Sequence, residues 1–487
     1  MSEQETLGAV FLDACRRHAG RRAVVDGETS LTYTDFAERV LDRVSVLDGL
    51  LDPSVRSVAL YAANSVEYLV SYYALVVSGR VPFLVDPQFG AAELTGIREG
   101  CGVEAFVVGS GNGFPLDADT HPLGESGQTL ALPARGSEPR HERVEPGRTT
   151  ATCRFTSGTT GAPKCLEFSH TAVVTAARNW VKGTALGADD RVLCLAAFSN
   201  GLAFNTSLLP VFLTGAELHV HRGMPTSGTV VRAVRRSGAT RLVAFPFVYG
   251  LLADARVDEA LSALTMAVSA AAVLDPRVRG EFESRHGVRI ADYYGIAEVG
   301  PCTFERDPAF PSGLGTPLPG VSLRLSEVGG GGTEIRVRTA SMASGYLNAP
   351  GELEARTDGD GYYRTGDLGH VTDGRLYVTG RLAGPINAAG RKIDPAEIER
   401  VALTLDGAHD AAAFADTDAN GNTIVHLVLA APDHVGRAAV TEVCRRNLAP
   451  YKVPSRVSVL PAIPRSSSGK PRFAELKQQV SKQEGTE

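Results

Sequence analysis

The sequence predicts a two-domain α/β protein, in which a large domain of mostly parallel sheets precedes a small α+β domain. The chain is 487 residues long, which is too long for one ordinary domain. Apolar, strand-like stretches alternate with helical stretches as far as residue 295. After about residue 315 the strands instead alternate apolar and polar residues and are joined by short turns, which favours antiparallel pairing.

The alternation starts with a strand at 57–62, a helix at 65–79 and a strand at 80–86. A helix at 91–100 and strands at 104–109, 191–197, 217–221, 240–246, 265–271 and 288–295 continue it. Strands separated by helices of about 10–15 residues form parallel sheets that are covered on both faces. Residues 111–147 interrupt this order with glycine, proline and histidine, and they predict an irregular surface connection.

The second half of the chain changes in character. The stretch "VSLRLSEVGGGGTEIRVRTA" predicts two antiparallel strands around a four-glycine turn, and 374–381 predicts a further strand. A compact α+β segment follows, with a helix at 394–405, strands at 410–418 and 422–430, a helix at 435–447 and a strand at 455–461. These roughly 100 residues suffice for a small domain. We therefore expect domains at 1–381 and 382–487.

Composition excludes several classes of protein. Apolar residues make up 43% and charged residues 21%, as in globular proteins. The net charge is −6 and there is no run of Lys and Arg, which argues against a nucleic-acid partner. No apolar run approaches the roughly 18 residues of a membrane span. The seven cysteines are scattered, and the N-terminus lacks an apolar signal core, so we expect a cytoplasmic protein with reduced thiols.

The decapeptide "FTSGTTGAPK" at 155–164 is the clearest candidate for phosphate binding. It combines two glycines, four hydroxyls and a lysine: Thr156, Ser157, Gly158, Thr159, Thr160, Gly161 and Lys164. The lysine comes three residues after the second glycine and precedes the strand-like "CLEFSH", whereas the common phosphate loop has its lysine at the start of a helix. Backbone N–H groups and hydroxyls on such a loop can close over a polyphosphate. Taken alone, the decapeptide is also compatible with a solvated turn.

Four later blocks carry further candidate residues. "DYYGIAE" ends a predicted strand with the aromatic ring of Tyr294, a close backbone approach at Gly295 and a hard oxygen ligand at Glu298. "YYRTGDLG" places Asp367 in a tight turn, where a carboxylate can accept both hydroxyls of a ribose. "GRLAGPINAAGRKIDPAEIE" follows, and "PRSSSGKPR" places Lys470 in a glycine loop close to the C-terminus.

The order and spacing of these five blocks resemble the adenylate-forming superfamily, which contains acyl-CoA synthetases, peptide-synthetase adenylation domains and related ligases. The resemblance covers nearly the whole chain. It implies an N-terminal core of three subdomains, two βα sheets and a small β-barrel, and a mobile C-terminal domain that rotates over it. It also implies that ATP and a carboxylate give an acyl-adenylate and pyrophosphate, after which a second nucleophile, usually a thiol, displaces AMP.

The resemblance assigns a role to each candidate. The segment 156–164 looks like the loop over the β- and γ-phosphates, and Tyr294 looks like the residue that stacks on adenine next to Gly295. Glu298 looks like the magnesium ligand, joined by Thr160 from the loop. Asp367 resembles the ribose clamp and Arg381 the arginine that reaches ribose or phosphate. Lys470 resembles the catalytic lysine that bridges the attacking carboxylate and the α-phosphate; its charge and that of Mg²⁺ on Glu298 would offset the repulsion between two anions.

The acid pocket departs from the family pattern. By resemblance it is lined by Phe198, Ser199, Asn200, Phe247, Ala270 and Ala271. The stretch "FSNGLAFNTS" has no acid to pair with an α-ammonium group, so we expect α-amino acids to be rejected. The alanines at 270 and 271 stand in a usually glycine-rich segment, which favours a small or flat acid; a compensating backbone shift is the alternative. Cys165 replaces the glycine after the loop lysine, and Ala297 replaces the threonine before Glu298.

Two hypotheses for the acceptor of the acyl group are compatible with the sequence. The hinge residue of the family, an aspartate or lysine, corresponds here to Ala383, which lacks the charge that biases the two domain orientations. The first hypothesis is transfer to a thiol, of CoA or of a carrier protein's phosphopantetheine. The second is transfer to an amine, including activation of nitrous acid to diazotise an aromatic amine. A catalytically dead adenylate-binding module is disfavoured because Lys470, Glu298 and Asp367 are all present. The resemblance implies a role in secondary metabolism, which stand-alone members of the superfamily often serve, and we expect a monomer or homodimer.

Overall fold

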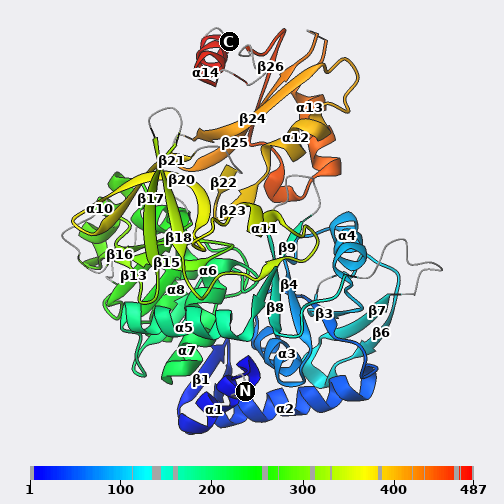
Figure 1. Cartoon of the computed structure of the whole chain (residues 1–487), viewed down its shortest axis with the longest axis vertical. Helices are drawn as coiled ribbons and strands as arrows, with labels where there is room; N and C mark the ends of the chain where they lie inside the picture. Colours follow the sequence, from blue (N-terminus) through cyan, green and yellow to red (C-terminus); the bar gives the residue numbers. More distant parts are fainter. Residues whose placement is uncertain are drawn as a thin grey trace. The chain divides into compact units, whose positions relative to one another are not determined.

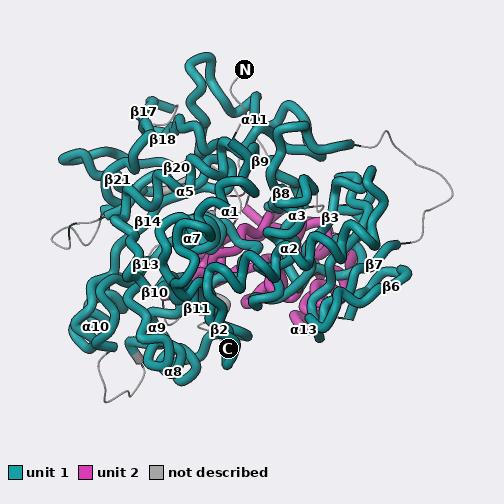
Figure 2. The backbone as a smooth tube through the Cα atoms, turned by 90° about the horizontal axis from the view of Figure 1, so that it is seen from below, with its two compact units in different colours: residues 1–156, 163–383 teal, residues 157–162, 384–487 magenta. Residues whose placement is uncertain are grey.

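The structure is a computed structural model of the chain (Figure 1). It describes residues 5–111, 113–133, 144–156, 163–254, 261–271, 274–305, 307, 313–328, 332–381, 386–418, 421–432, 434–464, 471 and 473–484. The chain divides into a large unit, residues 1–156 with 163–383, and a small unit, residues 157–162 with 384–487 (Figure 2). Among the described residues, no helix is long and apolar enough to cross a membrane.

The first sheet of the large unit has eight strands in the order β19-β9-β8-β4-β3-β5-β7-β6. Its strands are β3 (Ser57–Tyr61), β4 (Val81–Val85), β5 (Ala105–Val108), β6 (Ala118–Pro122), β7 (Thr129–Pro133), β8 (Thr150–Thr156), β9 (Lys164–Ser169) and β19 (Gly345–Tyr346). Strand β3 pairs in parallel with β4 and β5 through the helices α3 (Val66–Val77) and α4 (Ala91–Cys101). Every residue of β3 and β4 is buried, as expected for strands covered on both faces. The alternation read from the sequence is confirmed here.

The prediction of an irregular connection over 111–147 is wrong in part. Strands β6 and β7, with the short helix η1 (Gly124–Ser126) between them, form an antiparallel hairpin whose second strand pairs with β5. Leu130 and Ala131 of β7 are fully buried. Pro122 and Pro133 obscured the strands in the sequence, but proline is tolerated at the ends and edges of a sheet. Residues 134–143 lie outside the described residues.

The second sheet of the large unit has nine strands in the order β16-β15-β14-β13-β12-β10-β11-β1-β2. Its strands are β1 (Arg22–Asp26), β2 (Thr29–Thr32), β10 (Arg191–Cys194), β11 (Glu217–Val220), β12 (Arg241–Ala244), β13 (Met266–Ala270), β14 (Ile290–Ile296), β15 (Gly300–Phe304) and β16 (Thr316–Pro317). The five central pairings, from β1 through β14, are parallel, whereas β15 and β2 run antiparallel to their neighbours. This confirms the second βα sheet.

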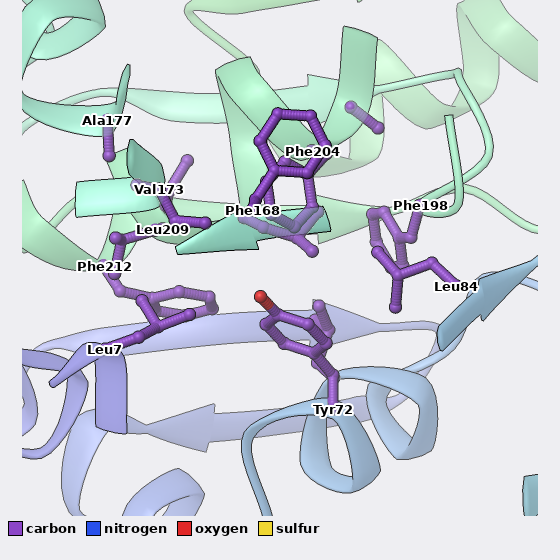
Figure 3. Close-up of a cluster of buried hydrophobic side chains, with 14 of the residues drawn as sticks. Leu7, Tyr72, Leu84, Phe168, Val173, Ala177, Phe198, Phe204, Leu209 and Phe212 are labelled. Atoms are coloured by element: carbon purple, nitrogen blue, oxygen red, sulfur yellow. The ribbon is translucent and has the colours of Figure 1, made fainter. Parts of the chain in front are cut away.

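Helices accompany this sheet and begin at residues that suit helix starts. They are α1 (Leu7–Arg17), α2 (Tyr33–Leu50), α5 (His170–Thr184), α6 (Gly201–Ala203), the π-helix η2 (Phe204–Leu208), α7 (Leu209–Thr214), α8 (Ser227–Ser237), α9 (Pro246–Asp254) and α10 (Pro276–His286). Thr32 and Asp35 form a capping box at the start of α2, in which each side chain accepts the other's backbone N–H. Figure 3 shows part of the largest core cluster, in which Phe168, Phe198, Phe204 and Tyr72 gather. All seven cysteines are buried free thiols.

The third part of the large unit is a four-stranded antiparallel sheet in the order β17-β18-β20-β21. It consists of β17 (Ser322–Val328), β18 (Gly332–Arg338), β20 (Tyr363–Thr372) and β21 (Arg375–Arg381), and the short α11 (Glu352–Ala355) precedes β20. The predicted hairpin and the strand at 374–381 are confirmed. The sheet occupies the place of the expected small barrel, and its two edge strands do not pair with each other in the described residues.

The small unit is α+β, as predicted. It contains β22 (Ile386–Ala388), β23 (Arg391–Ile393), α12 (Pro395–Ala402), β24 (Asp410–Thr417), β25 (Thr423–Ala430), α13 (Arg437–Asn447), η3 (Pro450–Lys452), β26 (Arg456–Leu460) and α14 (Phe473–Glu484). Strands β24 and β25 form the expected hairpin, and β26 joins β25 in parallel after α13. The core includes a buried ion pair in which Lys452 Nζ lies 2.8 Å from Glu397 Oε1.

Candidate active site

Two of the predicted nucleotide-binding residues meet directly. Tyr294 lies on β14 and Asp367 on β20, and the Tyr294 hydroxyl donates to Asp367 Oδ2 at 2.6 Å. Burial, and after it the charge of Asp367, raises the pKa of Tyr294 well above its usual value, so the phenol stays a hydrogen-bond donor. The backbone N–H of Asp367 donates to Thr365 Oγ1 at 3.0 Å, and that hydroxyl donates to the Ile335 carbonyl at 2.7 Å. These bonds fix the backbone that presents the carboxylate. Asp367 lies inside the strand β20 and not in a tight turn, so the prediction of a turn at this residue is wrong.

The backbone around this pair leaves no room for larger residues. A Cβ at Gly295 would lie 2.5 Å from the Tyr293 hydroxyl and 2.8 Å from the Gly300 carbonyl oxygen, so only glycine fits. Gly366, which precedes Asp367, has a φ of 74°, in the left-handed region that favours glycine. In the β20–β21 register Arg381 stands opposite Asp367. Gly295 is therefore tightly packed against the protein's own residues, and a close approach of its backbone to a ligand stays a prediction. The backbone of Arg381 lies beside Asp367 in the sheet.

Glu298 follows β14 in the chain, and tyrosine hydroxyls lie against its carboxylate. Its side chain is buried, and the hydroxyl of Tyr346 on β19 donates to Glu298 Oε1 at 2.6 Å. Burial and the charge of Glu298 raise the pKa of Tyr346, and the same two causes raise the pKa of Tyr363. Arg356 Nη1 donates to the Tyr363 hydroxyl at 3.3 Å. The carboxylate is thus oriented by a hydroxyl donor, and an oriented carboxylate suits a hard-cation ligand.

This arrangement fits a magnesium ion that is held mainly by substrate. In the described part of the chain, no group of three or more His, Cys, Asp and Glu side chains is placed to hold a metal. Magnesium in nucleotide enzymes is commonly bound by one or two carboxylates, with waters and phosphate oxygens completing its shell. One oriented carboxylate at Glu298 meets that requirement. Thr160, the second expected ligand, lies outside the described residues.

The lysine of the phosphate loop has a carboxylate partner. Thr156 ends β8 opposite Lys164, which begins β9, so an antiparallel strand pair flanks the loop. The strand predicted after the lysine is confirmed. Lys164 Nζ donates to Glu352 Oε1 at 2.8 Å and to Oε2 at 2.5 Å. Asn348 braces the same strand end, because its Oδ1 accepts the N–H of Cys165 at 2.8 Å and its Nδ2 donates to the Pro163 carbonyl at 2.9 Å. The loop residues Ser157, Gly158, Thr159 and Gly161 lie outside the described residues.

The expected acid pocket is built from the segment after β10 and the end of β13. Phe198 is fully buried, and its N–H donates to Asn64 Oδ1 at 2.7 Å. Asn200 caps α6, since its Oδ1 accepts the N–H of Leu202 at 2.8 Å, so part of this side chain serves the helix start. The π-helix η2 follows, a rare element that is enriched at functional sites. Ser199, in the turn between Phe198 and Asn200, is partly buried.

Two alanines stand where the other wall of the expected pocket is predicted. Ala270 is buried at the end of β13, and Ala271 has a φ of 74°, which non-glycine residues rarely adopt. Ala271 therefore has a backbone conformation that favours glycine. Phe247 on α9 stacks on Phe245, with ring centroids 6.3 Å apart and planes inclined by 19°. Lys470 and Ala383 lie outside the described residues, as does the side chain of Arg381.

Sequence reasoning missed four residues of this region: Arg154, Tyr346, Asn348 and Glu352. Three of them follow one another closely after residue 345 and contact β9 or Glu298 only through the tertiary fold. Arg154 carries a visible signal, because it is a charged residue in the middle of the strand "TATCRFT", whose first five residues are all buried.

Comparison with known proteins assigns the chain to a family. The model of the AMP-binding enzyme family matches residues 11–347, and that of the AMP-binding enzyme C-terminal domain matches residues 397–470. The chain belongs to the AMP-binding enzyme family. It is thus an adenylate-forming enzyme, an AMP-forming ligase, and the resemblance drawn from the five sequence blocks is confirmed.

Similar proteins extend over almost the full length of this AMP-binding enzyme. An octahydroindenyl-propanoyl:CoA ligase of Mycobacterium tuberculosis is 27% identical, over 98% of this chain and 100% of its own. Triostin synthetase I of Streptomyces triostinicus is 29% identical, over 95% of this chain and 92% of its own. The structure of an amide bond synthetase from Marinactinospora thermotolerans superimposes with a TM-score of 0.82 at 21% identity, over 96% and 99% of the two chains. At that identity the last likeness concerns the fold, and it confirms the fold class.

Proposed function

We propose that the enzyme uses ATP and Mg²⁺ to adenylate a small acid other than an α-amino acid, and that it transfers the acyl group to a thiol. The observation that carries the nucleotide part is the direct hydrogen bond between Tyr294 and Asp367, which joins a candidate adenine platform to a candidate ribose clamp. The Mycobacterium relative, a CoA ligase by name, supports the thiol of CoA or of a carrier protein as acceptor.

The residues of the large unit have complementary roles in this proposal. Tyr294 and Asp367 hold the nucleoside, and Arg381 adds a charge for ribose or phosphate. Glu298 would hold Mg²⁺, whose charge offsets the charge that builds up on the phosphate oxygens. Lys164 leaves Glu352 to meet the β- and γ-phosphates, together with the loop from Thr156 to Gly161. Lys470, on the C-terminal domain, bridges the incoming carboxylate and the α-phosphate.

Two covalent steps follow from these roles. A carboxylate oxygen of the acid attacks the α-phosphorus, and pyrophosphate leaves with the electron pair of the broken bond. The acceptor thiol then attacks the acyl carbonyl and loses its proton, and AMP leaves. The domain comprising residues 382–487 has to turn between the steps, with Ala383 as the pivot. Because Ala383 lacks the charge usual at this position, an amine acceptor, including the nitrite-dependent diazotisation, remains the second candidate.

The setting of the enzyme is part of the proposal. We expect it to work in the cytoplasm, in secondary metabolism, as a monomer or homodimer without nucleic-acid or membrane partners. The name of the Streptomyces relative, Triostin synthetase I, is in keeping with that role.

A pyrophosphate-release screen tests the proposal. Small carboxylic acids, nitrite and the proteinogenic amino acids are offered with ATP and Mg²⁺, each with and without CoA and an aromatic amine. We expect release with at least one small acid and thioester formation with CoA. The segment after β10 offers no acid for an ammonium group, so amino acids should react at least about 10²-fold less well. Efficient turnover of any amino acid, or release only in the presence of an amine, would contradict the respective part of the proposal.

A further inference from the structure

Arg154 differs from the other buried arginines of the protein. Five arginines among the described residues are less than 9% exposed. Four of them have a carboxylate partner: Arg43 with Glu67, Arg80 with Asp48, Arg241 with Asp190 and Arg279 with Asp292. Arg154 is 4% exposed and forms no ion pair with any described carboxylate. The fold therefore buries this guanidinium group without the direct carboxylate contact that the other four have, and Glu298 acts on it only as a nearby negative charge.

The contacts of Arg154 satisfy only part of its hydrogen-bonding capacity. Its Nη2 donates to the Ala297 carbonyl at 3.3 Å, and its guanidinium carbon lies 4.3 Å and 4.7 Å from the ring centres of Phe168 and Phe204. Its Nε is buried and has no hydrogen-bond partner among the described residues. Two aromatic faces attract a cation, but they do not replace an anion. Burial lowers the pKa of Arg154 to about 10, so the group keeps its charge at neutral pH.

The position of the guanidinium group connects two parts of the candidate active site. Ala297, which accepts its hydrogen bond, directly precedes Glu298. Nη1 lies 2.8 Å from the place where a Cβ would stand on Gly201, in the segment that forms the expected acid pocket. Phe204, on the π-helix after Gly201, and Phe168 lie near each other in Figure 3, where the core of this region is drawn. A larger residue at position 201 would push the guanidinium group out of this place.

We propose that Arg154 is a specificity-determining residue that pairs with a second anionic group of the acid substrate, so that small dicarboxylic acids are the preferred class. The inference rests on the adenylation function proposed above. The planar fork of a guanidinium matches a carboxylate in two parallel hydrogen bonds. In the proposed function the reacting carboxylate is already assigned to Lys470. Arg154 is therefore available for the other end of the molecule.

Matched pairs of acids test this inference. Pyrophosphate release is measured for malonate against propionate, succinate against butyrate and phthalate against benzoate. We expect the wild type to favour the diacid of at least one pair by 10-fold or more in kcat/KM. Arg154→Met, which keeps the length of the apolar stem, should lower the value for that diacid about 10²-fold and leave the monoacid within about threefold. Gly201→Ala should change the ratio in the same direction, because its methyl group displaces Nη1.

Two further variants separate recognition from folding. Arg241→Met removes an equally buried arginine that bonds the Thr184 and Ala185 carbonyls, so it should lower the melting temperature without changing the diacid-to-monoacid ratio. Arg154→Lys keeps the charge, and it should retain part of the preference even if Arg154→Met folds poorly.

The outcomes distinguish the two proposals. A wild type that favours every monoacid, or an Arg154→Lys enzyme whose ratio and individual rates equal those of the wild type, would overturn the role of Arg154 and leave adenylation intact. The same holds if Arg154→Met slows diacids and monoacids equally, since the arginine would then serve the reacting carboxylate or the fold. Absence of pyrophosphate release with any acid would overturn both proposals.

Discussion

Removal of one hydroxyl group tests whether Glu298 holds the metal. In Tyr346→Phe the ring remains and the hydroxyl that donates to Glu298 Oε1 at 2.6 Å is lost. Both side chains are only 7% exposed, so water has poor access to replace the lost donor. A hydrogen bond to a charged group contributes about 1.5–3 kcal/mol, which corresponds to roughly 10–150-fold in an equilibrium constant. Residues that orient a metal ligand typically contribute about 10–100-fold to metal affinity or activity.

The assay is the Mg²⁺ dependence of pyrophosphate release at a fixed, saturating concentration of ATP. We expect the half-maximal Mg²⁺ concentration of Tyr346→Phe to rise about 10–100-fold. Glu298→Gln should raise it further, because a neutral amide is a poorer ligand for a hard cation than a carboxylate.

Tyr33→Phe is the matched control. It also removes a buried hydroxyl, which donates to the Ala216 carbonyl at 2.6 Å, but this tyrosine lies at the start of α2 and outside the site. Its magnesium dependence should equal that of the wild type even if its melting temperature falls. If Tyr346→Phe and Glu298→Gln both keep the wild-type magnesium dependence in a folded protein, Glu298 is not the ligand and another acid must be.

Four other substitutions address the remaining groups. Lys470→Ala should nearly abolish adenylation while ATP binding stays within a few fold, and more than about a tenth of wild-type pyrophosphate release would remove it from the catalytic role. Ala383→Pro should spare adenylation and block thioester formation, whereas loss of adenylation in a folded variant would place the hinge elsewhere. Ala271→Gly should relieve the strain of the left-handed backbone at this residue, so the melting temperature should rise or stay unchanged. Bulkier acids should react faster with this variant. A melting temperature lower by several degrees would argue against strain. Stability should decline as the pH falls below about 6.5, because burial lowers the pKa of His170, whose Nδ1 accepts the Leu7 N–H at 3.1 Å. In thermal melts His170→Asn should reduce this decline. An unchanged dependence of the melting temperature on pH would exclude His170 as its source.

Sequence patterns predicted the parts of the fold that depend on local periodicity. The buried strands β3 and β4 are continuous apolar runs, and the hairpin of β17 and β18 alternates with a period of two, so both could be recognised without tertiary information. The hairpin of β6 and β7 was missed because its strands end in prolines and its first strand, "ADTHP", has no buried residue. Edge strands carry little of the apolar signal on which such predictions depend.

The sequence offers candidate site residues where a short motif carries its own chemistry, and it gives no signal where a role depends on contacts between distant segments. The blocks around Tyr294 and Asp367 were recognisable, although only the structure shows that the two side chains share a hydrogen bond. Tyr346 belongs to a strand of two residues that is defined by its pairing with β9. Glu352 becomes relevant only because Lys164 lies against it. Neither contact leaves a periodic trace in the sequence.

The position of Arg154 shows why the acid pocket could not be understood from its own segment. The stretch "FSNGLAFNTS" after β10 contains no charged residue that could pair with a substrate. The charge comes from β8, two residues before Thr156, and residues two apart share one face of a strand. One strand therefore supplies both the entry to the phosphate loop and the cation beside the acid segment. Because Gly201 and Arg154 fill the same space, an exchange of either should alter acid selection without touching the nucleotide residues Tyr294 and Asp367.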